Sequence, residues 1–221
     1  MFGSSWIPMA RANCHDFPNR VWHLTHRCHQ REFLFKCLWL LTLILSSLGC
    51  TVIHHSPETV RGDLAYQLFV AISEGDVETA QTLLAEGVNP NIVDSSGASP
   101  LHHAAADNDL EIARLLLSAG AKVDALTLGK TTPLMWAAHF GRTEAAQLLL
   151  ENGADVNWRG SHEETPLIEA VLHEHYDTAQ TLLAHGADVN AALVEGATAL
   201  DIAVRSGDQN LIQLLRNAGA K

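Results

Sequence analysis

Apolar and small residues recur along the chain at a fixed interval of 33 positions, with helical spacing inside each interval. Two columns that repeat at this interval are a leucine column (Leu83, Leu116, Leu149, Leu182, Leu215) and an alanine column (Ala71, Ala104, Ala137, Ala170, Ala203). Within one interval, the segment TEAAQLLLENG at 143–153 carries its apolar residues at the spacing of one helix face. Chance does not bring several residue types into register at one period, so a tandem structural unit is predicted over 61–221.

Turn residues mark where the helices of each unit begin and end. A proline turn occurs as SPL at 99–101 and as TPL at 132–134 and 165–167. Proline is tolerated in the first turn of a helix, where its missing N–H has no partner to lose. The preceding Ser99, Thr132 or Thr165 can cap that helix with its hydroxyl. A glycine at the same period is predicted to end the second helix in the left-handed conformation (Gly87, Gly120, Gly153, Gly186, Gly219).

These motifs together resemble the ankyrin repeat family over residues 61–221. The resemblance implies an all-α solenoid of stacked helix-turn-helix units with short β-hairpin or loop fingers. The units are expected at about 61–93, 94–126, 127–159, 160–192 and 193–221. The last unit has Arg216 where the others have leucine, and a charge suits a face with no further neighbour.

An uncharged stretch between Lys36 and Glu58 precedes the array. Its apolar part CLWLLTLIL follows two basic residues, Arg31 and Lys36, and passes into small residues before Cys50, as in a secretion signal. The end of this run resembles the lipobox of bacterial lipoproteins, with Gly49 at the scissile bond. It departs from that family at Ser47 and Leu48, where leucine and then alanine or serine are usual.

The lipobox resemblance implies removal of 1–49, including the apolar run 37–49, and a diacylglycerol on Cys50 at the start of a linker, 50–60. Thr51 rather than aspartate follows the cysteine, which by the same resemblance implies the bacterial outer membrane, facing the periplasm. The alternative is an uncleaved transmembrane anchor. The apolar stretch from Cys37 to Ile53 has 17 residues, whereas a spanning helix usually needs about 20. A translation start at Leu34 is a further possibility for the N-terminus.

Charge separates the two parts of the chain. Residues 1–50 hold five basic and two acidic side chains, whereas residues 51–221 hold nine basic and 23 acidic ones, a net charge of −14. This excess repels phosphate backbones, so nucleic acid is not an expected partner. It favours solubility and basic protein partners, and a monomer is expected.

Candidate chemistry is sparse downstream of Cys50, because all four cysteines lie in the first fifty residues. The chain contains neither G-x-S-x-G nor H-E-x-x-H, so no enzyme, cofactor or metal site is predicted. His102 follows SPL, where the ankyrin family commonly has a histidine, and the resemblance implies a structural role in the turn. His173 and His175 flank Glu174, but residues two apart on a helix diverge by about 200°, so joint metal binding would need a loop. Metal handling or an enzyme-accessory role through histidines is the rival function.

Ankyrin arrays bind protein partners through a concave face of finger tips and first helices, and the resemblance extends that expectation to this chain. The positions that match this face and carry large or polar side chains are Trp136, His139, Phe140, Trp158, His162, Leu172, His173 and Arg205. Large amphipathic side chains in a groove are usual binding hot spots. The alternative for Trp136 and Phe140 is that they fill gaps between helices.

Overall fold

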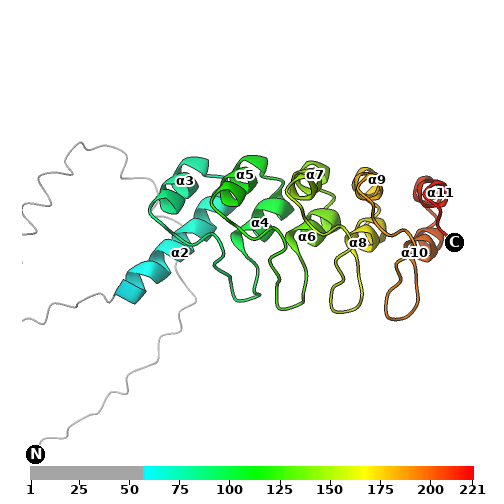
Figure 1. The fold of residues 1–221 in the computed structure, drawn as a ribbon, viewed down its shortest axis with the longest axis horizontal. Helices are drawn as coiled ribbons and strands as arrows, with labels where there is room; N and C mark the ends of the chain where they lie inside the picture. Colours follow the sequence, from blue (N-terminus) through cyan, green and yellow to red (C-terminus); the bar gives the residue numbers. More distant parts are fainter. Residues whose placement is uncertain (1–56) are drawn as a thin grey trace, which may run out of the picture. The chain divides into compact units, whose positions relative to one another are not determined.

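The computed structural model describes residues 57–221, and every regular element in that part is an α-helix (Figure 1). The helices are α2 (Pro57–Glu74), α3 (Val77–Ala85), α4 (Pro100–Asp107), α5 (Leu110–Ser118), α6 (Pro133–His139), α7 (Thr143–Glu151), α8 (Pro166–Leu172), α9 (Tyr176–Ala184), α10 (Ala199–Ser206) and α11 (Gln209–Asn217). The predicted signal segment and Cys50 lie outside the described residues. Among the helices of 57–221, none is both long and apolar enough to cross a bilayer.

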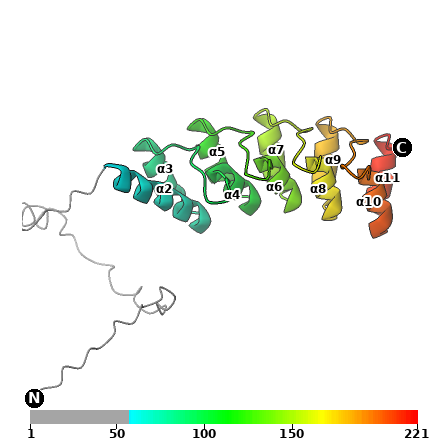
Figure 2. The ribbon, with the colours of Figure 1, turned by 90° about the horizontal axis from the view of Figure 1, so that it is seen from below.

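Successive helices pack as pairs, and the pairs stack side by side. The first helices of the pairs form one row and the second helices form another, with loops projecting beyond the first row as fingers (Figures 1 and 2). Within the first row α6 packs against both α4 and α8, and within the second row α7 packs against α5 and α9. This arrangement confirms the predicted all-α ankyrin solenoid. The fingers are turns rather than strands, and the described residues form one isolated β-bridge, Ala192–Thr198.

Helix α2, the first in the described part of the chain, begins at Pro57, four residues before the predicted start of the array at residue 61 and inside the segment interpreted as a linker. Proline at a first helical position fits, because its fixed φ is already helical. With 18 residues, α2 is twice the length of α3.

The core follows the two periodic columns. Every alanine of the alanine column is at most 2% exposed, and every leucine of the leucine column is at most 4% exposed. Alanine lets two helices approach closely, while each buried leucine contributes roughly 2 kcal/mol through removal of apolar surface from water. The core is therefore continuous along the stack, and no unit buries its apolar face alone.

The predicted helix ends are confirmed at most positions. The hydroxyls of Thr132 and Thr165 accept from the backbone N–H groups of Met135 and Ile168, each at 3.3 Å. The five glycines of the periodic glycine column have φ between 87° and 94°, a left-handed conformation that glycine adopts at little cost.

Ser99 departs from this pattern because a histidine lies three residues after it. The Nδ1 atom of His102 accepts the backbone N–H of Ser99 at 3.0 Å, so its proton resides on Nε2, which donates to the Thr131 carbonyl at 3.1 Å. His102 is fully buried, and burial lowers its pKa to about 4, against the opposing effect of the Thr131 hydrogen bond. The predicted structural role of His102 is confirmed, and the ring also joins two units.

A second column of polar residues ties each unit to the next. The side chain of Asn157 donates to the Gly186 carbonyl at 3.2 Å and accepts the Asp188 N–H at 2.7 Å. Asn91 makes the equivalent two bonds to Gly120 and Lys122. Asp124 occupies the same place one unit later but can only accept, and burial with the nearby Asp155 charge raises its pKa.

The residue before each second helix has one of two roles. Asp76, Asp109 and Asp208 cap their own helices by accepting backbone N–H groups. Arg142 and His175 occupy the equivalent place and instead donate backward to the preceding unit. Arg142 Nε lies 2.7 Å from the Ala106 carbonyl, and His175 Nε2 lies 3.0 Å from the His139 carbonyl.

Candidate functional site

Helix α6 presents three of the predicted binding residues on the first row of helices. Trp136 and His139 are three residues apart and Phe140 follows at the end of the helix, so the three share one face. The opposite face of α6 is fixed in the core by Leu134, Ala137 and other buried neighbours. The helix therefore holds this cluster on a rigid support.

Trp136 is both a structural and a surface residue. Its indole N–H donates to the Thr131 hydroxyl at 3.1 Å, and its ring packs edge-to-face on His102 and His103 at centroid distances of 5.3 and 5.5 Å. The side chain is half-buried. Phe140, in contrast, is 46% exposed and contacts the ring of His139 at 4.7 Å. Of the two rings, Phe140 is the more exposed.

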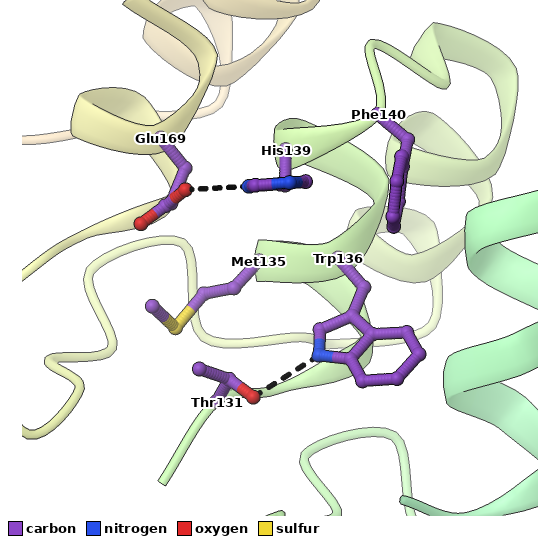
Figure 3. A pocket seen from close by; sticks show the side chains of 6 residues that line it. All are labelled: Thr131, Met135, Trp136, His139, Phe140 and Glu169. Atoms are coloured by element: carbon purple, nitrogen blue, oxygen red, sulfur yellow. Dashed lines mark hydrogen bonds and ion pairs between the residues drawn. The ribbon is translucent and has the colours of Figure 1, made fainter. Parts of the chain in front are cut away.

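A hollow of about 280 Å³ lies beside these rings. Its lining comes from a finger, from α6 and from α8: Thr131, Met135, Trp136, His139, Phe140 and Glu169 (Figure 3). Apolar atoms form most of the wall, while Glu169 and the imidazole of His139 form a polar side. This combination suits an amphipathic side chain.

The polar side of the hollow continues into a second histidine. His139 Nδ1 lies 3.1 Å from Glu169 Oε2, and His173 Nε2 lies 3.8 Å from the same oxygen. The two imidazole rings are 4.0 Å apart. Burial lowers the pKa of His173, as do the neighbouring His139 and His175, while Glu169 acts in the opposite direction. The three groups form a compact donor cluster across two units.

His173 and His175 are not two positions of one helix. The residues from His173 to His175 form a turn in which Glu174 has a left-handed φ of 61°, and the two rings stack at 6.2 Å. His175 is already bonded to the His139 carbonyl. The nearest partners of His173 are therefore His139 and Glu169 rather than His175.

The remaining predicted site residues lie outside the hollow. Trp158 is in a finger, where its indole N–H donates to the Lys130 carbonyl at 2.9 Å, and this bond gives it a structural role. His162 is in the same finger, with its side chain 88% exposed. Leu172 ends α8 and Arg205 lies near the end of α10, both exposed.

A second hollow, of about 400 Å³, lies further toward the start of the same row, between α2 and α4. Phe69, Asp94 and His103 are among its lining residues, with His103 Nε2 2.9 Å from Asp94 Oδ2. Burial alone would raise the pKa of Asp94, but hydrogen bonds from Ser96, His103 and Ala98 outweigh it and lower the pKa to about 2. Both hollows thus combine aromatic and acidic groups.

Met135 and Glu169 line the hollow but were not predicted as site residues. A signal for Glu169 existed in the sequence, because it lies 33 positions after Trp136, in the same column. That column places it on the same row of helices, one unit later.

Comparison with known proteins gives one family. No curated protein matches the chain. A family model described as "Ankyrin repeats (3 copies)" matches twice, at residues 68–160 and at 158–221, and the two matches together span well over half of the sequence. With the stacked helix pairs and left-handed glycines, these matches show that the chain belongs to the ankyrin repeat family.

Proposed function

We propose that this chain is a non-catalytic docking module, held at a bacterial membrane by a lipid on Cys50, that binds a protein partner along its first row of helices. Ankyrin repeats generally bind protein partners. The observation that carries the proposal is the hollow beside Trp136, with the exposed ring of Phe140 at its edge. An exposed aromatic ring next to a preformed apolar hollow is typical of a binding hot spot.

The chemistry of the row favours a particular kind of partner. A volume of about 280 Å³ is at the lower limit of small-molecule pockets, roughly 300–1,000 Å³, and suits a single inserted side chain. Acidic groups border both hollows, Glu169 at one and Asp94 at the other. We therefore expect a partner segment with an apolar anchor flanked by lysine or arginine. Stacking leaves little ordering to be done on binding, which favours affinity.

The membrane attachment rests on the apolar run that ends at Cys50. Helix α2 begins seven residues later, at Pro57, so a fully extended linker would reach at most about 25 Å. The array would then be held close to the bilayer surface. A mature lipoprotein carries more than one acyl chain, and two are needed for stable anchoring. The outer membrane, facing the periplasm, is the proposed location.

Replacement of Cys50 by serine tests the attachment. We expect the membrane-extracted wild type to have the mass of residues 50–221 plus a diacylglycerol, whereas Cys50→Ser should carry no lipid mass. The measurement is intact-mass spectrometry of both proteins. A full-length mass in membranes for both variants would replace the lipid anchor by an uncleaved apolar span.

Replacement of Phe140 by alanine tests the binding surface. We expect capture of a partner from a periplasmic extract to weaken by at least about tenfold, because truncated hot-spot rings cost 1–2 kcal/mol or more. Stability should change by less than about 0.5 kcal/mol, since the ring is exposed. Helical circular dichroism verifies the fold.

Tyr176→Ala is the matched control, because this aromatic residue is also exposed but begins α9 in the second row of helices. It should leave capture unchanged. Equal capture by wild type and Phe140→Ala would exclude the hollow as the binding surface.

A further inference from the structure

His139, Glu169 and His173 converge from two successive units although they are 30 and four residues apart in sequence. His139 ends α6, Glu169 lies in α8, and His173 follows the last residue of α8. One nitrogen of each imidazole and one oxygen of Glu169 lie within 4.8 Å of one another. No other group of this kind is found among the described residues.

The donor set is that of a zinc site. Zinc takes imidazole nitrogen and carboxylate oxygen at about 2.0–2.2 Å, which places tetrahedral ligands about 3.3 Å apart. The distance from Glu169 to His139 is 3.1 Å and that to His173 is 3.8 Å, so small rotations of the side chains would close the set. We propose that His139, Glu169 and His173 bind a divalent transition metal of the zinc class on the first row of helices.

The scaffold already restricts two of the three ligands. The carbonyl of His139 accepts the Nε2 proton of His175, which ties the end of α6 to the following unit. Glu169 is the least exposed of the three, with 18% of its side chain accessible, and its helix is capped by Thr165. His139 and His173 remain about 43% and 36% exposed, so an ion has access from solvent.

Three protein ligands leave a fourth position open, as in zinc sites that exchange a water or an external donor. His139 and Glu169 also line the hollow beside Trp136, so this position would lie at its rim. The proposed ion does not depend on the proposed protein partner, because it needs only the three side chains of this chain.

Titration of the full chain with zinc, measured by isothermal titration calorimetry, tests the site. The residues before Pro57 contain four cysteines and six histidines that can bind zinc on their own, so the variants are compared with wild type in the same chain. We expect His139→Asn and His173→Asn each to lose one zinc equivalent. Because loss of a supporting partner alone costs 10–100-fold, loss of a direct ligand should weaken this site by at least about 100-fold.

Glu169→Gln is the most conservative variant, since it keeps the shape of the side chain and removes the charged ligand. If a histidine variant loses its helical circular dichroism signal, the comparison of Glu169→Gln with wild type decides the test. His162→Asn is the control, because its side chain is 88% exposed and lies outside the cluster. Magnesium should give no heat at this site, as it prefers all-oxygen ligands. Identical zinc stoichiometry and affinity in wild type and Glu169→Gln would overturn the proposal and leave an ordinary histidine–carboxylate ion pair.

Discussion

Acidification from pH 7 to pH 4 is expected to lower the free energy of unfolding by about 3 kcal/mol through His102. The pKa of this ring falls from 6.5 to about 4 in the folded chain, mainly because it is buried, with His103 adding to the effect and Asp94 and the Thr131 carbonyl opposing it. Between these values the unfolded chain binds a proton that the folded chain does not. Each pH unit in that window is worth about 1.4 kcal/mol. Stability is therefore complete above about pH 6.5 and is lost as the pH falls toward 4.

Besides burial, the contact of the Nδ1 atom disfavours protonation. In the folded chain this atom accepts the Ser99 N–H, so a proton added there would face another donor in a buried site. The measurement is urea unfolding at a series of pH values, for wild type and for His102→Met. Methionine is the residue found at the equivalent place one unit later, Met135, where it is also buried. The difference between the two proteins isolates His102 from His173, whose lowered pKa acts in the same direction. Parallel pH profiles would contradict the prediction.

Gly141→Ala is expected to destabilise the array by about 3 kcal/mol. Gly141 has a φ of 65°, where a residue with a Cβ costs about 1 kcal/mol or more. A Cβ there would also lie 2.5 Å from His175 Nδ1, and crowding in a packed site typically costs about 1–3 kcal/mol. Relief requires movement of the His175 ring, which would break its bond to the His139 carbonyl.

Gly207→Ala separates strain from crowding. Gly207 has a φ of 82° in the equivalent turn, but an added Cβ would have no atom within 4 Å. It should therefore cost only about 1 kcal/mol. Urea unfolding of both variants gives the comparison. Equal losses at the two positions would show that the His175 ring yields without cost.

The 33-residue period accounts for what the sequence could predict. Alanine and leucine columns, threonine caps and terminal glycines are local features that each unit repeats, so one copy explains the others. His102 was also predictable, because its place after SPL matches the turn histidine of the family, and its contact to Ser99 lies within one turn. The described structure confirms these features.

The donor cluster was not predicted, for a physical reason. His173 and His175 are close in sequence, whereas His139 meets Glu169 and His173 of the next unit at separations of 30 and 34 residues, close to one period but not equal to it. Side chains on adjacent helices meet when their rotamers point across the gap between the helices. The residue types at periodic positions do not specify those rotamers. The same holds for Trp136, whose indole reaches the Thr131 hydroxyl. The need for a small residue at Gly141 could not be predicted either, because it arises from the close approach of the His175 ring.

Arg142 and His175 give up the cap of their own helix and bond to the carbonyl of the unit before. In a linear array, stability divides into what each unit supplies by itself and what each junction supplies. Aspartate at this place strengthens the unit, whereas a long donor strengthens the junction. The units in the middle of the array therefore take more of their stability from contacts with the preceding unit. The units toward its ends take more of theirs from their own helices. The central segments should gain and lose structure as a single cooperative block, so that a partner seated on any one of them senses the integrity of all.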